Sequence, residues 1–188
     1  FAGKEWIASG ADKRWSTPSN RSGGALPLPT EGVIFGSSSV LPCSLDVNVT
    51  VKSVQITPFY TGNFDFGTDT LTLSGKGRGS FRTGGRYSFA DGVLRFEGDS
   101  AQTLETDADD TLPAIMHSGN GILTIRNGQL TAADLLLENG TTVLADSFVV
   151  SVKSVSGSGS LKLGVAGELK VNGNADFSNL ASFEPKTT

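Results

Sequence analysis

The chain contains one histidine, His117, and one cysteine, Cys43, so any site that needs imidazole or thiol chemistry must be built around them. A Ser-His-Asp triad would have to use His117, and a histidine-rich zinc site would lack its other ligands. We interpret His117 as a surface or turn residue. Leu41 and Leu45 share one side of an alternating stretch with Cys43, which indicates a buried structural thiol. A single cysteine also excludes an intramolecular disulfide.

Carboxylates gather at Glu105, Asp107, Asp109 and Asp110. Their oxygens suit a hard cation such as calcium, but the spacing and the glycine of a calcium loop are missing, so we expect a solvated acidic loop. Paired carboxylates of a polysaccharide lyase or hydrolase stay open as an alternative, although the sequence assigns no pair to one face. We therefore predict a protein that is not an enzyme, with no catalytic, metal-binding or cofactor-binding residue.

Charges of opposite sign form two neighbouring blocks. Residues 74–95 carry a net charge of +4, and residues 96–112 carry −6. Such blocks can satisfy one another within one molecule or pair between molecules. We interpret them as an ordinary mixed soluble surface, with docking between subunits, or binding of an anionic polysaccharide to the basic block, as the alternatives. Trp6 and Trp15 either stack on sugar rings or cover the apolar end of the fold. The candidate contacts to another subunit or to a polysaccharide are Trp6, Trp15, Lys76, Arg78, Arg82 and Arg86.

The elements that position these residues are short alternating segments separated by glycine, asparagine, aspartate and serine, which is typical of strands joined by turns. Leu71 and Leu94 are 23 residues apart and Ile122 and Phe148 are 26 apart, and both steps fit one coil of a solenoid. We predict a right-handed parallel β-helix of six or seven coils over residues 33–183, with an irregular cap or arm over residues 1–32 and a tail over residues 184–188. An antiparallel β-sandwich is the alternative.

Two stretches are ambiguous in this pattern. Residues 131–138 fit a strand better than the helix that a threonine cap and a terminal Asn-Gly would delimit. Residues 99–118 are acidic and contain Pro113, so we expect a loop that leaves the stack.

Composition limits the partners. A net charge of −4 gives no reason to expect nucleic acid, and no apolar run is long enough for a transmembrane segment. The chain begins at Phe1 without methionine, which fits a secreted protein whose signal peptide has been removed.

The amino-terminal region combines tryptophan, asparagine and proline with a following strand pattern. The motifs lie in residues 6–10, 14–20, 23–27, 31–35 and 43–54. They resemble the opening of bacterial secreted surface proteins of the autotransporter and adhesin type, with departures at Arg21, where that family has tryptophan, and at Glu31. The resemblance implies an exported β-helix with a structural or adhesive role at the cell surface, and no catalytic residues.

We therefore expect an extracellular structural module. Its ends expose unpaired strand edges, so self-association into a head-to-tail homopolymer, a surface filament or fibre, is the expected mode of assembly. Binding of cell-surface polysaccharide is the alternative.

Overall fold

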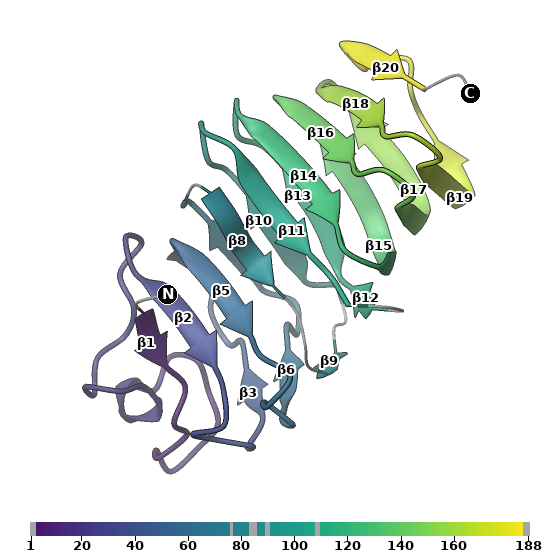
Figure 1. Ribbon diagram of the computed structural model, residues 1–188. Helices are drawn as coiled ribbons and strands as arrows, with labels where there is room; N and C mark the ends of the chain where they lie inside the picture. Colours follow the sequence, from purple (N-terminus) through teal and green to yellow (C-terminus); the bar gives the residue numbers. More distant parts are fainter. Residues whose placement is uncertain (1–2, 76, 83–85, 89–90, 108–109, 186–188) are drawn as a thin grey trace.

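The computed structural model describes residues 3–75, 77–82, 86–88, 91–107 and 110–185. These residues form a parallel β-solenoid of about seven turns, in which the strands of each turn pair with those of the turns before and after it (Figure 1). The only helix among them is the single 3-10 turn η1 (Pro18–Asn20) in the amino-terminal region. The predicted solenoid is confirmed, and the antiparallel sandwich is excluded because every pair of named strands is parallel.

Sheet 1 runs the full length of the solenoid and contains nine strands. In stacking order they are β1 (Gly3–Glu5), β2 (Gly32–Phe35), β5 (Ser53–Ile56), β8 (Gly77–Arg82), β11 (Gln102–Glu105), β14 (Ile122–Arg126), β16 (Thr141–Leu144), β18 (Ser160–Leu163) and β20 (Ser182–Glu184).

Sheet 2 contains eight strands, and sheet 3 is a short third face with three. Sheet 2 comprises β4 (Val49–Val51), β7 (Thr70–Leu73), β10 (Val93–Phe96), β12 (Asp110–Leu112), β13 (Ala114–His117), β15 (Gln129–Leu137), β17 (Val149–Gly157) and β19 (Glu168–Ala175). Sheet 3 comprises β3 (Cys43–Ser44), β6 (Asn63–Asp65) and β9 (Arg86–Ser88).

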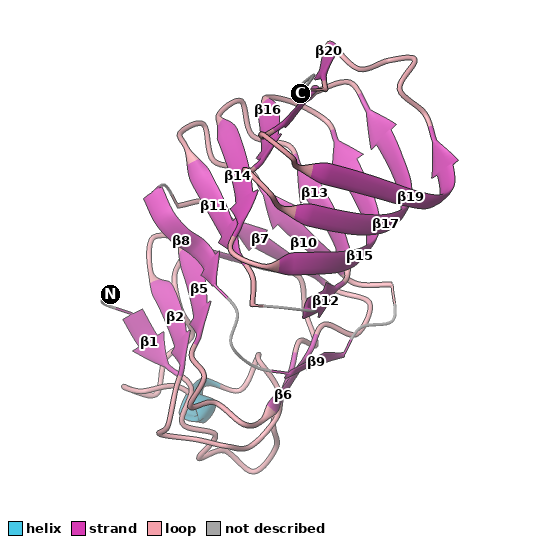
Figure 2. Cartoon of the chain, turned by 45° about the vertical axis from the view of Figure 1, so that its right-hand side comes forward, coloured by secondary structure: helices cyan, strands magenta, loops and turns pink. Residues whose placement is uncertain are grey.

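The cross-section changes along the solenoid where two short strands become one long strand. The first part of β15 pairs with β12 and its second part pairs with β13, and the long strands β15, β17 and β19 stack above one another (Figure 2). In the first half of β15 the even-numbered Leu130 and Ala132 are buried, and in the second half the odd-numbered Leu135 and Leu137 are buried. The alternation of inward and outward residues therefore shifts by one residue between the two halves. The strand therefore covers two faces of the core.

The core consists of columns of apolar side chains in register. One column contains Leu71, Leu94, Ile115, Leu135 and Val155, which pair from strand to strand across sheet 2 and are all fully buried. Each of these side chains contributes roughly 1.5 to 3 kcal/mol when removed from water. The alternating pattern of the sequence produces this column because successive residues of a strand face opposite sides.

The corner between sheet 2 and the following strand of sheet 1 is lined by glycines. A Cβ on Gly121 would lie 2.4 Å from the Ser100 carbonyl oxygen, and one on Gly140, where φ is +61°, would lie 2.4 Å from the Gly121 carbonyl oxygen. Glycine therefore lets successive coils approach one another at this glycine corner.

Two sequence predictions need correction, and a third is confirmed. Residues 99–118 contain β11, β12 and β13 and do not form a loop outside the stack. Residues 131–138 lie almost entirely in strand β15, as the favoured reading predicted, and form no helix. The 23-residue step from Leu71 to Leu94 is one turn, as predicted, because the two residues pair. The 26-residue step from Ile122 to Phe148 is wrong as a turn, because Ile122 pairs with Thr141 in the next coil.

Candidate functional site at the ends of the solenoid

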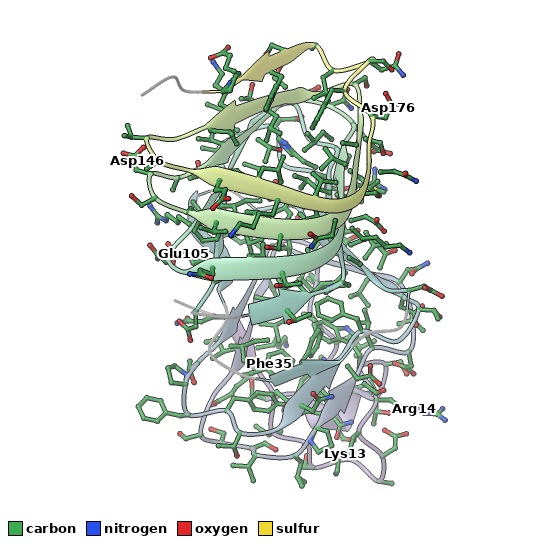
Figure 3. All side chains as sticks on the ribbon, turned by 90° about the vertical axis from the view of Figure 1, so that its right-hand side faces the viewer. Lys13, Arg14, Phe35, Glu105, Asp146 and Asp176 are labelled. Atoms are coloured by element: carbon green, nitrogen blue, oxygen red, sulfur yellow. The ribbon has the colours of Figure 1, made fainter. Side chains whose placement is uncertain are left out.

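The amino-terminal end is closed by a cluster of aromatic rings around a buried arginine. The Arg21 guanidinium carbon lies 4.4 Å from the Trp6 ring centroid and 4.3 Å from the Trp15 ring centroid. The same tryptophans contact Phe35, which Figure 3 shows inside the lower coils. Arg21 and both tryptophans are at most 1% exposed. The cation and the two indoles therefore replace solvent over the first coil, and each cation–π contact is worth about 2 kcal/mol when desolvated.

The buried arginine lies beside the single cysteine. The guanidinium nitrogens have no hydrogen-bond acceptor within the described residues. Desolvation raises the pKa of the Cys43 thiol to about 12, and the positive charge of Arg21 opposes this shift. Desolvation also lowers the pKa of Arg21. A thiol that is fully buried and protonated is a poor nucleophile and a poor metal ligand. Cys43 is the buried structural thiol that the sequence predicts.

The outer edge of β1 is occupied by the same chain. The Ser22 Oγ accepts a hydrogen bond from the Glu5 amide at 2.9 Å, and the Ser22 amide donates to the Glu5 carbonyl at 2.8 Å. Trp6 and Arg21 extend this contact as an antiparallel bridge. The outward N–H and C=O groups of Glu5, which an added strand would need, are therefore used within the chain, which is how proteins protect an exposed edge.

The six candidate contact residues do not form one surface. Trp6 and Trp15 were candidates for contact with a sugar or a second subunit, but both are buried in the cap and offer no open face. Lys76 lies outside the described residues. Arg78 and Arg82 lie on β8 and Arg86 lies on β9. These positions are on two different sheets, so the basic block is divided between two faces.

The acidic block lies directly beside the basic one on sheet 1. The register places Glu105 between Arg82 of β8 and Arg126 of β14. Arg126 and Glu105 form an ion pair in which the Arg126 Nε lies 3.1 Å from the Glu105 Oε1. Glu105 points from the flank of the solenoid in Figure 3. The partner of Glu105 in this ion pair, Arg126, lies outside the basic block of residues 74–95, so pairing between the two blocks stays a prediction.

The last described strands are more exposed than the capped first coil. Phe177 and Phe183 are 37% and 41% exposed, and their rings stack in parallel with centroids 5.1 Å apart. Val165, in the turn before β19, is also exposed. Within the part of the chain that the structure describes, no strand pairs with the outer edge of β19.

His117 lies in the core, so its interpretation as a surface or turn residue is wrong. The side chain is 1% exposed, and its Nδ1 lies 2.9 Å from the Oγ1 of the buried Thr142. Desolvation lowers the pKa of His117 to about 4, so the imidazole is neutral at physiological pH. The enclosed ring cannot reach a substrate.

The rest of the described structure was searched for a metal site, a hollow and a membrane-spanning helix. No group of three histidine, cysteine, aspartate or glutamate residues in the described ranges has the arrangement of a metal site. A shallow hollow of about 370 Å³ lies along the glycine corner, with Thr30, Lys52, Ser74 and Asp99 in its lining. A search of the described residues for a helix that could span a membrane finds none.

Comparisons of the chain with protein-family models, with curated proteins and with solved structures give no match.

Proposed function

We propose that this chain is a non-catalytic structural module of an extracellular surface, with an adhesive or fibre-forming role. Its resemblance to bacterial secreted surface proteins motivates the location. The observation that carries the proposal is the closed interior of the solenoid: Trp6, Arg21 and Trp15 cover the first coil, and Cys43 and His117 lie inside the core. A solenoid with a filled core presents its extended outer faces to a partner.

The interior supports a structural rather than a catalytic role. The residues best suited by type to nucleophilic or general-base chemistry, Cys43 and His117, are enclosed, and desolvation moves both pKa values away from neutrality. The apolar columns fill the space between the sheets. Function in this proposal comes from the outer faces of the scaffold.

Assembly through the amino-terminal arm has little support. The arm residues contact their own first coil, and Ser22 occupies the edge of β1 that a head-to-tail neighbour would need. The contact of Ser22 with Glu5 therefore opposes head-to-tail assembly through β1.

The proposal is tested on the source cells. Antibodies against the 188-residue chain should label intact cells, and external protease should remove the label. Labelling that requires lysis would contradict the extracellular role. Turnover of polyuronides by the purified chain would contradict the non-catalytic assignment. Binding to a glycan array that is lost on substitution of Arg82 and Arg86 would replace the structural role with polysaccharide binding.

A further inference from the structure

The hollow at the glycine corner has a floor of bare backbone. Gly75 and Gly98 line it in successive coils. A Cβ on Gly75 would lie 2.2 Å from the Lys52 carbonyl oxygen, and one on Gly98 would lie 2.7 Å from the Gln102 Cδ, so a side chain at either position would collide with its neighbour. Because the floor lacks side chains, a ligand can approach the main chain of these coils directly.

A buried glutamine makes this floor rigid. Gln102 is 1% exposed, and its Nε2 donates to the carbonyl oxygens of Leu73 and Gly75 at 2.9 and 2.8 Å. Its Oε1 accepts a hydrogen bond from the Gly98 amide at 2.8 Å. Three hydrogen bonds from one enclosed side chain therefore hold two successive coils together. A site that is formed in advance loses less conformational freedom when a ligand binds.

The walls of the hollow carry hydrogen-bonding groups. Pro29 and Thr30 of the arm form one wall, and the Ser74 Oγ fixes it by donating to the Pro29 carbonyl oxygen at 2.8 Å. Lys52 supplies an ammonium group that makes no hydrogen bond or ion pair within the described residues. Asp99 supplies a carboxylate whose Oδ1 accepts one hydrogen bond from the next coil. The described lining therefore offers donors and acceptors with no net charge.

The two charged groups of the lining are separated along the solenoid axis. Lys52 precedes β5 and Asp99 lies in the turn before β11, and β8 lies between these two strands in sheet 1. Strands stack about 4.8 Å apart, so the two residues belong to levels about 10 Å apart. An amino acid carries its ammonium and carboxylate groups on one carbon atom. The spread of the lining along the axis therefore favours an extended ligand over a small ion or an amino acid.

The chemistry of the lining suits hydroxyl groups. A sugar hydroxyl both donates and accepts hydrogen bonds, so it can accept from Lys52 and donate to Asp99. The C–H face of a pyranose ring can lie against Pro29 and the bare glycines. The hollow of about 370 Å³ takes a short segment of such a chain. An extended peptide would need pockets for its alternate side chains, and a floor of backbone offers none.

We propose that this hollow binds an uncharged linear polysaccharide, which lies along the solenoid axis at the glycine corner. Lys52 and Asp99 contact its hydroxyl groups, and Gly75 and Gly98 form the surface beneath it. The inference deepens the adhesive role in the proposed function by naming a class of ligand, and it rests on that function for where the ligand is met.

The first test measures binding by the purified 188-residue chain. Isothermal titration calorimetry with cellohexaose, mannohexaose and xylohexaose should show saturable binding of at least one of these neutral hexamers. Its dissociation constant should change less than about twofold between about 50 and 300 mM NaCl, because salt screens charges and the ligand has none. Hexagalacturonate, the charged hexamer, should bind no more tightly than the neutral one.

The second test locates the bound sugar. Lys52→Met keeps the aliphatic stem and removes the ammonium donor, so it should weaken binding about tenfold. Lys153→Met makes the same change at an exposed position of β17 outside the hollow and should leave binding unchanged. Both lysines are exposed, so urea unfolding should give the two variants the stability of the parent chain.

The proposal is overturned if none of the three neutral hexamers binds, or if hexagalacturonate binds more tightly than they do. Equal affinities of Lys52→Met and Lys153→Met would also overturn it, because the sugar would then lie elsewhere. Equal binding of a Gly-Ser peptide of similar length would assign the hollow to peptides instead. Labelling of intact cells is a separate measurement, so failure of sugar binding is distinguishable from failure of the proposed function.

Discussion

Lowering the pH from 7 to 5 should destabilise the fold by about 2 kcal/mol through one side chain, His117. The pKa of this histidine is about 4 in the folded chain, against 6.5 for an unperturbed histidine. Above pH 6.5 the imidazole is neutral in both states and adds no pH dependence. As the pH falls below 6.5 the unfolded chain binds a proton that the folded chain does not, so the free energy of unfolding decreases. The full loss, about 3 kcal/mol, is reached near pH 4.

Urea unfolding at pH 7.5, 6 and 5 measures this effect, because the chain has no other histidine to titrate in the window. The comparison protein carries His117→Leu together with Thr142→Val, since the single change would leave the buried Thr142 hydroxyl without its partner. The difference in unfolding free energy between the two proteins should change by about 2 kcal/mol from pH 7.5 to pH 5. The imidazole proton resonances of the folded chain should not shift above pH 5. Titration near pH 6.5 in the folded chain, or equal pH dependence of the two proteins, would refute the assignment.

Three further predictions concern the glycine corner and the cap. Gly121→Ala should lower the free energy of unfolding by about 2 kcal/mol or more in urea unfolding, because the new methyl group meets the carbonyl oxygen of Ser100 in the coil below. The control is Gly36→Ala, whose Cβ would have no neighbour closer than 3.6 Å. This control should change the free energy of unfolding by less than about 0.5 kcal/mol. Arg21→Lys should cost about 2 kcal/mol in the same assay, because an ammonium group does not stack on two indoles, and an unchanged midpoint would contradict the stacking role. The Cys43 thiol should react with a thiol reagent only at the rate of unfolding, and rapid labelling of the native chain would show that it is not enclosed.

The solenoid was predictable because its apolar residues alternate and recur at one turn. Leu71 and Leu94 illustrate this, since they occupy neighbouring coils in the same column. The stretch from residue 99 to 118 was missed because polar residues take inward positions there. Gln102 is buried and donates to the carbonyl oxygens of Leu73 and Gly75, partners 29 and 27 residues away in sequence. A local pattern of hydrophobicity does not identify hydrogen-bond partners that are so distant in sequence.

The same limit applies to the ends of the molecule. Trp6 and Trp15 were recognisable as a cap or a binding face, but their contact with Arg21 depends on how the arm folds back. The burial of His117 was hidden because its hydrogen-bond partner, Thr142, belongs to a later coil.

The glycine corner determines where this protein can accept new sequence. A longer turn at Gly121 or Gly140 would push apart coils that touch through bare backbone. The turns that leave sheet 1 in the early coils are different, since Phe59 at one of them is 72% exposed. Foreign loops, affinity tags or epitopes inserted beside Phe59 would extend into solvent and leave the stacked coils in register, which makes the solenoid a scaffold with one side open to grafting.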